Sequence, residues 1–228
     1  MLLVSTAAPS AAEDNEQLLS GSFGIGSDYT FRGISQTLGG NAIEVSVDLS
    51  LRSGIYAYAW GSNVDFVPDG EPDDGASHEI DLAIGYATDI SENWSVDVAL
   101  IRYLFPGTAV DIDYDYNELM ASLYYADNYS ATVAYSGNVD GTGEKSLLYR
   151  LGASFGFPFD TSFDICYGYH DLSDAYGSAY SYVESALARQ FGNATISLAY
   201  NNTDRSSDLI YDSRMTGPRF VLSLQVEW

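Results

Sequence analysis

Strict two-residue alternation between apolar and polar side chains constrains this sequence more than any other feature. Between residues 43 and 51, every odd position is Ile, Val or Leu and every even position is Glu, Ser or Asp. The closing segment 220–228 likewise carries an apolar residue at every even position. Because successive side chains of a β-strand point to opposite sides, each segment predicts a strand with one apolar and one polar face.

Segments of this kind follow one another along the chain and predict an all-β protein. Most are close to the roughly 9–11 residues with which a tilted strand crosses a bilayer. The segment 180–190 alternates least regularly. The predicted strands lie at residues 21–32, 41–51, 55–64, 79–88, 94–104, 115–126, 129–136, 146–157, 161–170, 180–190, 194–201 and 218–228.

The connections between these segments alternate between short and long without exception. The short ones lie at 52–54, 89–93, 127–128, 158–160 and 191–193, and the long ones near 33–40, 65–78, 105–114, 137–145, 171–179 and 202–217. Short turns at one rim and long loops at the other are typical of outer-membrane barrels. We therefore predict a closed transmembrane antiparallel β-barrel of about 12 strands, with short periplasmic turns and long extracellular loops. An even strand number places both chain ends at the periplasmic rim.

The composition of the two strand faces favours a membrane barrel over a soluble ligand-binding barrel. The apolar faces carry almost no charge; Arg102 and Arg189 are exceptions near strand ends, where arginine can reach the headgroups. Aromatic residues cluster toward strand ends, as in the girdles of outer-membrane barrels. They are Tyr29, Phe31, Tyr56, Tyr86, Trp94, Tyr125, Tyr129, Tyr135, Phe155, Phe163, Tyr169, Tyr200, Phe220 and Trp228. No stretch approaches eighteen consecutive apolar residues, which excludes a helical span. We expect the bacterial outer membrane as the location.

The charge of the chain excludes one class of partner. Nine Lys and Arg against 32 Asp and Glu give a net charge of −23, which repels nucleic acid. An aromatic content of 14% argues against disorder as the cause of this acidity. Small residues at Ser10 and Ala12 suit signal-peptidase cleavage. We expect residues 1–18 to be a residual signal peptide and flexible N-terminus, and residues 19–228 to form a single β-barrel domain.

Candidate catalytic and metal-binding groups are weaker than their structural alternatives. The lone Cys166 precedes His170 by four residues on one predicted strand, and His170 precedes Ser173 at a strand end, with no orienting third group evident. Acids of the 65–78 loop can hold Ca²⁺, but the loop lacks the pattern of a calcium-binding loop. The pair Asp73 and Asp74 is therefore interpreted as solvated loop charges. We predict no catalytic, cofactor-binding or metal-binding residue, and no cofactor.

Three stretches resemble a known family. Residues 27–37, SDYTFRGISQT, resemble the opening strand and first loop of the TorF-type porin family of proteobacteria. Residues 56–66 and 79–86 resemble that family's third and fourth strands, and residues 225–228 resemble the terminal aromatic signal for insertion of bacterial barrels. The resemblance implies an outer-membrane barrel with porin function and specifies no solute and no functional residue.

The strand parity also predicts which side chains line the lumen. The pore-lining candidates are the acids Asp28, Glu44, Asp48, Glu79, Asp81, Asp97, Glu118 and Asp164 and the basic residues Arg32, Arg150 and Arg219. Small inward residues are predicted at Gly24, Gly26, Ala57, Ala59, Gly61, Gly85, Gly152, Ser154 and Gly168, which favours an open space. These charges form either a salt-bridge network that plugs the barrel or a constriction that selects solutes.

The function expected from this lumen is passive diffusion of small polar solutes or ions, with a preference for cations. The expected partners are outer-membrane lipid, lipopolysaccharide and small polar solutes or cations, and no nucleic acid. The alternative is a non-conducting barrel that acts as a structural protein or adhesin through its acidic extracellular loops.

Overall fold

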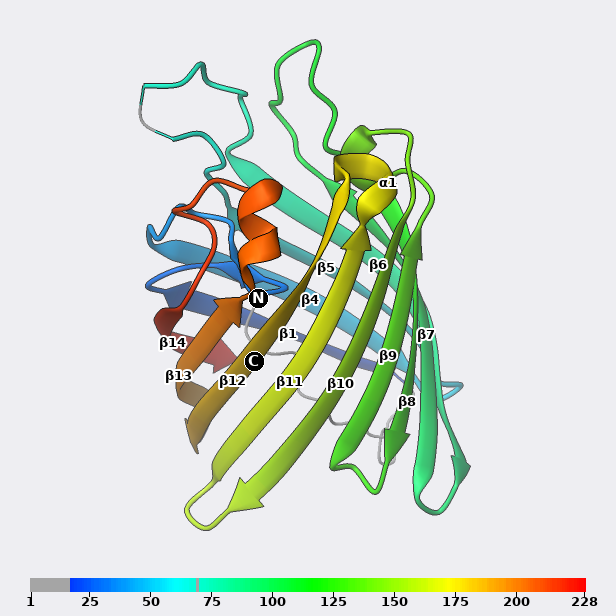
Figure 1. The fold of residues 1–228 in the computed structure, drawn as a ribbon. Coiled ribbons are helices and arrows are strands. Elements are labelled where there is room, and N and C mark those ends of the chain that lie inside the picture. The colour runs from blue at the N-terminus through cyan, green and yellow to red at the C-terminus, as the bar shows by residue number, and fades with distance from the viewer. Residues whose placement is uncertain (1–16, 69) are drawn as a thin grey trace.

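The computed structural model describes residues 17–68 and 70–228, and in these residues twelve strands close into one antiparallel barrel (Figure 1). The predicted fold class is confirmed. The expected signal peptide lies almost entirely outside the described residues. No helix among the described residues is long and apolar enough to cross a membrane.

Each barrel strand pairs with its neighbours in sequence, and β1 closes the barrel by pairing with both β4 and β14. The barrel strands are β1 (Gln17–Gly26), β4 (Ala42–Leu51), β5 (Ile55–Asn63), β6 (His78–Ser91), β7 (Trp94–Leu104), β8 (Tyr116–Tyr125), β9 (Tyr129–Ser136), β10 (Ser146–Phe157), β11 (Thr161–Leu172), β12 (Ser178–Phe191), β13 (Ala194–Thr203) and β14 (Arg219–Glu227). The short strands β2 (Thr30–Phe31) and β3 (Ile34–Ser35) form a separate hairpin. The described parts of the loops contain three short helical turns: η1 (Val139–Gly141), α1 (Ser173–Tyr176) and η2 (Arg205–Leu209).

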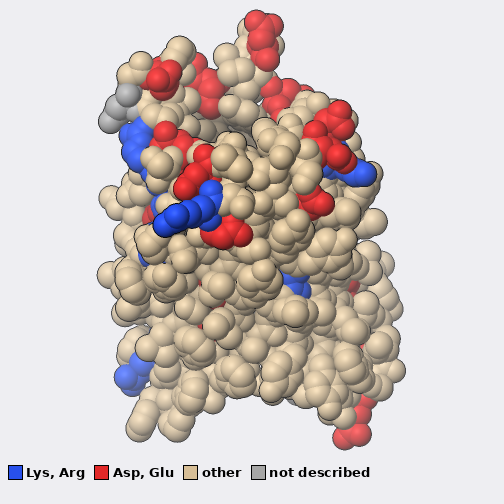
Figure 2. Space-filling model, viewed as in Figure 1, with Lys and Arg blue, Asp and Glu red and all other residues tan. Residues whose placement is uncertain are grey.

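The alternation in sequence becomes an apolar outer wall and a polar inner wall. Ile43, Val45 and Val47 are about half exposed on the outside of β4, as predicted. The wall below the long loops is almost free of charge on the face that Figure 2 shows, whereas acidic residues gather over the loops. Aromatic rings pair across neighbouring strands at the short-turn rim, where Trp94 and Tyr125 lie 4.7 Å apart between ring centroids. These features are those of a barrel embedded in lipid.

The two rims differ as predicted. Short turns join β4 to β5, β6 to β7, β8 to β9, β10 to β11 and β12 to β13 at the lower rim in Figure 1. The longer loops and the helical turns lie at the opposite rim. The backbone amide of Gly21 on β1 donates to the carbonyl of Trp228 at 3.1 Å, so β1 and the C-terminus meet at the short-turn rim.

The long loops are tied to one another by hydrogen bonds that tyrosine side chains donate to carboxylates. Tyr114 donates to Asp74 at 3.0 Å, and Tyr176 of α1 donates to Asp140 of η1 at 2.9 Å. Asp74 is only 6% exposed, so its interpretation as a solvated loop charge is wrong. Its carboxylate also accepts the backbone amide of Ala76 at 2.9 Å and thereby shapes its own loop.

Strand β5 faces the opposite way from its prediction. Its register places Tyr58 beside the inward Asp48 of β4, and Trp60 beside the inward Asp81 of β6. The aromatic residues of β5 therefore fill the lumen, and the small residues predicted to face inward, Ala57, Ala59 and Gly61, lie on the lipid side. The aromatic–small alternation of this strand carries no clear difference in polarity, so its orientation depends on its neighbours rather than on its own sequence.

The first strand also ends earlier than predicted. It was expected over 21–32, but β1 runs from Gln17 to Gly26 and the chain then leaves the barrel wall. Residues 27–41 turn into the barrel and include the β2–β3 hairpin. Tyr29 is 1% exposed inside the barrel, so it does not belong to an interfacial girdle.

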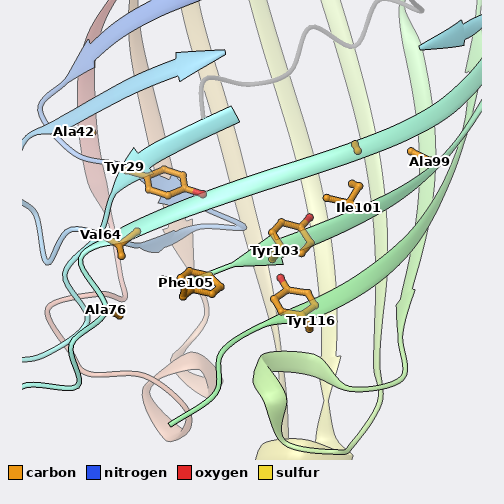
Figure 3. Packing of buried hydrophobic residues seen from close by; sticks show 10 residues of the cluster. Tyr29, Ala42, Val64, Ala76, Ala99, Ile101, Tyr103, Phe105 and Tyr116 are labelled. Atoms are coloured by element: carbon orange, nitrogen blue, oxygen red, sulfur yellow. The ribbon is translucent and has the colours of Figure 1, made fainter. Parts of the chain in front are cut away.

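Two apolar clusters fill the part of the barrel nearest the long loops. One gathers Tyr29 with Ile101, Tyr103 and Tyr116 from the inner faces of β7 and β8, as Figure 3 shows. The other surrounds Ile34 of the hairpin and includes inward residues of β9 to β12, among them Leu148. The inserted hairpin thus belongs to the packed core of the molecule.

Candidate functional site in the barrel lumen

A tight turn at the tip of the β2–β3 hairpin carries the first functional candidate. Phe31 pairs with Ile34, and the two residues between them have positive φ angles, 53° at Arg32 and 79° at Gly33. Positive φ at both central residues defines a type I′ turn, which suits a two-residue hairpin. Arg32 therefore lies at a hairpin tip inside the lumen, and not on a wall strand as predicted.

Arg32 joins the hairpin to the far side of the barrel. Its guanidinium forms an ion pair with Glu118 of β8 at 2.5 Å and contacts Nε2 of His170 on β11 at 3.2 Å. Tyr180 of β12 donates to the Arg32 carbonyl at 3.2 Å. Arg32 and Glu118 are 7% and 1% exposed, so water screens the pair poorly.

The base of the inserted segment is held by a second buried ion pair. Asp28 accepts hydrogen bonds from Ser35 at 2.6 Å and Thr37 at 2.7 Å, and pairs with Arg219 of β14 at 2.7 Å. The same arginine donates to the carbonyl of Thr216 in the last long loop at 3.0 Å. The hairpin is thus fixed at its tip and at its base.

Acidic side chains dominate the rest of the inner wall. The predicted candidates Glu44, Asp48, Glu79, Asp81, Asp97, Glu118 and Asp164 all occupy inward register positions on their strands, as does Arg150. Asp97 accepts a hydrogen bond from the inward Tyr56 at 3.0 Å. Glu79 and Asp81 are buried on β6, and one oxygen of each accepts no hydrogen bond from a described residue. These acids are distributed over five strands, β4, β6, β7, β8 and β11.

Comparison with known proteins identifies the family. Residues 10–224 match the Gcw_chp family, described as "Bacterial protein of unknown function". The chain belongs to the Gcw_chp family. The match covers the whole barrel from β1 into β14. A search of curated proteins finds no match.

Solved structures show which fold this family member has. The KdgM porin superposes with a TM-score of 0.57 at 10% identity, covering 91% of this chain and 98% of that chain. The NanC porin gives a TM-score of 0.57 at 11% identity, covering 92% and 99%. The COG4313 outer membrane channel from Pseudomonas putida F1 gives 0.54 at 10% identity, covering 95% and 98%. Together with the apolar wall, this likeness shows that the chain has the fold of outer-membrane porins.

One inward acid of this family member was not predicted from the sequence. Glu184 on the irregular strand β12 accepts the backbone amide of Gly33 at 2.9 Å and the thiol of Cys166 at 3.3 Å. The poor alternation of apolar and polar residues on β12 was the signal in the sequence that this strand differs from the others. It arises because the bulky Tyr180 and Tyr182 point inward and pack on the hairpin. Tyr182 lies over Gly168, where a Cβ atom would stand 2.1 Å from the tyrosine ring.

The candidate catalytic groups are engaged in these lumen contacts. Cys166 donates to Glu184, and His170 contacts Arg32. Within the described residues no hydrogen bond joins Cys166 to His170, and no group of three or more His, Cys, Asp or Glu side chains is arranged to hold a metal ion.

Proposed function

We propose that this chain is a porin-like channel of the outer membrane through which small polar solutes and cations diffuse passively. The observation that carries the proposal is the excess of carboxylates on the inner face of the barrel. The fold shared with porins supports it, as does the resemblance of residues 27–37 to the TorF-type porins. The inserted hairpin is the constriction of this channel.

The balance of inward charges favours cations. The inward-facing acids are the eight predicted from the sequence and Glu184, whereas the inward-facing arginines are Arg32, Arg150 and Arg219. Asp28 and Glu118 are neutralised by ion pairs. Five acids form no ion pair with another described residue: Asp48, Glu79, Asp81, Asp97 and Asp164. Rings of acidic side chains in a narrow lumen attract cations and repel anions.

One of the similar structures contains a ligand whose charge is opposite to that of the cations proposed here. The KdgM porin has been solved in complex with oligogalacturonate, an oligomer of sugar acids and hence a polyanion. A lumen with an excess of carboxylates repels such a ligand over its whole length. The proposed solutes of this barrel are therefore small and neutral or positively charged, unlike that ligand.

The rival function is a non-conducting barrel that presents its acidic loops to an external partner. The packed clusters around Tyr29 and Ile34 favour it, because they fill the lumen near the long loops. In the channel proposal the hairpin leaves this position when the channel opens. The hairpin is held by apolar packing and by polar contacts at its tip and base, and among the described residues it forms no hydrogen-bonded ladder with the barrel strands.

Conductance in a planar bilayer distinguishes the two functions. The purified wild-type protein and the Arg32→Ala variant are inserted separately, and the Arg189→Gln variant serves as control because that side chain lies on the outer wall at the short-turn rim. Steady current through the wild type supports a channel, and a larger current through Arg32→Ala than through the wild type supports a hairpin constriction. Silence of all correctly folded variants supports the non-conducting barrel.

A further inference from the structure

Two neighbouring carboxyl groups on β6 are buried inside the barrel with incomplete hydrogen bonding. Glu79 is 2% exposed and Asp81 is 7% exposed. The Oε2 atom of Glu79 and the Oδ1 atom of Asp81 accept no hydrogen bond from any described residue. Leaving a buried carboxylate oxygen unsatisfied is costly, and native proteins do so rarely. One oxygen of each carboxyl group is therefore left to accept a further hydrogen bond or a positive charge.

Aromatic rings enclose these two carboxylates. In the barrel register, Asp81 lies between Trp60 of β5 and Tyr103 of β7. Tyr29 of the inserted segment lies 5.2 Å from Trp60 between ring centroids, and its hydroxyl interacts with Glu79. Tyr29 and Tyr103 lie inside the barrel wall in Figure 3. Aromatic faces attract cations, so rings and carboxylates favour the same kind of ligand.

The arginines that face the lumen interact with acidic groups other than Glu79 and Asp81. Arg32 pairs with Glu118 and Arg219 pairs with Asp28. Arg150 interacts with Cys166 and Glu184. Among the described residues, none of these side chains forms an ion pair with Glu79 or Asp81. No described arginine therefore supplies a positive charge to this pair, and Glu79 and Asp81 share a hydrogen bond with each other instead.

Two carboxyl groups alone do not suit a multivalent metal ion. The described residues offer no group of three or more His, Cys, Asp or Glu side chains suited to a metal ion. A divalent cation such as Ca²⁺ needs about six to eight oxygen ligands, many of them carboxylates. Two carboxylates with aromatic walls suit a smaller charge. We propose that Glu79 and Asp81 form a lumen site for one monovalent cationic group, an alkali ion or the protonated amine of a small solute.

This site has a physiological role only if the barrel is the channel proposed above, because it then holds the cation during passage. Binding itself is measurable whether or not the barrel conducts. If the barrel conducts but binds no cation at Glu79 and Asp81, the channel proposal stands and the site is refuted. If the barrel binds the cation but does not conduct, only the channel proposal is refuted.

Isothermal titration calorimetry of the refolded full chain in detergent micelles tests the site. Potassium chloride and methylammonium chloride are titrated separately into the wild type, the double variant Glu79→Gln/Asp81→Asn and the control Asp48→Asn/Asp164→Asn. The control removes the same number of inward carboxylates elsewhere in the lumen. Heat-modifiable electrophoretic mobility confirms that each barrel is folded, and the single variants Glu79→Gln and Asp81→Asn replace the double variant if it does not fold.

The wild type and the control should bind at least one of the two cations saturably at one site. The β6 variants should bind it about ten-fold more weakly or worse, because each loses a charged partner. Binding of potassium alone identifies a bare-ion site, and binding of methylammonium alone identifies an amine site. The proposal is overturned if neither cation binds the wild type saturably, or if the control loses as much affinity as the β6 variants.

Discussion

Arg32 and Glu118 form an ion pair inside the barrel, between the tip of an inserted hairpin and a strand of the far wall. The nitrogen–oxygen distance is 2.5 Å, and both side chains are buried. This contact turns a loop that follows the first strand into a bridge across the lumen. It also fixes the tip of the hairpin that we propose as the constriction.

Removal of this pair should loosen the hairpin. Breaking a buried ion pair on one side costs about 3–5 kcal/mol, because the remaining charge stays buried without a partner. Arg32→Ala should therefore raise the open probability or the conductance several-fold in planar bilayers. Glu118→Gln should act in the same direction, whereas Arg189→Gln should leave the conductance unchanged. Equal conductance of Arg32→Ala and the wild type would show that the hairpin does not restrict the lumen.

The lipid face should tolerate charge far less than the lumen face. Val47 and Leu82 are 43% and 45% exposed on the outer wall. Arginine at either position should cost about 2–4 kcal/mol near the bilayer midplane. The neighbouring inward substitution Ser46→Arg should cost much less. Refolding yield into liposomes measures the difference, and similar yields for both classes would contradict the assigned faces.

The fold was predictable because its signals are local. Alternation on β4 and β14 and the sorting of turn lengths both follow from a barrel with lipid outside and polar groups inside. The orientation of β5 was not predictable, because Tyr58 is amphipathic and suits either face. The inserted hairpin was missed because Tyr29 and Phe31 continue the alternation of β1. Its position depends on distant partners such as Glu118, which no local pattern reveals.

The lumen acids were largely predictable, while their partners were not. Strand parity predicts Asp48, Asp81 and Asp97 as pore-lining residues, and their register positions face inward. Glu184 was missed because its strand alternates poorly. The pairing of Asp28 with Arg219 joins residues at opposite ends of the chain, so it follows only from closure of the barrel.

A glycine on β6 should be intolerant of any side chain. A Cβ atom at Gly85 would lie 2.3 Å from the Cζ atom of Tyr56, which packs over it inside the lumen. Overpacking of this kind costs about 1–3 kcal/mol. Gly85→Ala should therefore lower the urea midpoint of unfolding, and Tyr56→Leu should restore part of the loss. An unchanged midpoint for Gly85→Ala would show that the ring moves away freely.

The contact between two extracellular loops should weaken as pH rises. Burial raises the pKa of Asp140 from 3.8 to about 6, although a hydrogen bond from Tyr176 opposes the shift. A carboxyl group with a raised folded-state pKa stabilises the docked loops below its unfolded pKa, and this stabilisation is lost as pH rises through about 6. Hydrogen exchange at residues 173–177, corrected for the intrinsic rate, should therefore be faster at pH 7.5 than at pH 5. Asp140→Asn should abolish this pH dependence, and its persistence in that variant would assign it to another group.

The reversal potential under a salt gradient tests the central claim most directly. Inward carboxylates without ion-pair partners should make the wild-type pore cation-selective at neutral pH, with less selectivity in acid and in high salt. The triple variant Asp48→Asn/Asp81→Asn/Asp97→Asn should lose most of this selectivity, while the exposed loop variant Glu71→Gln/Asp111→Asn should keep it. An anion-selective wild type, or a lumen triple variant with unchanged reversal potential, would contradict the account.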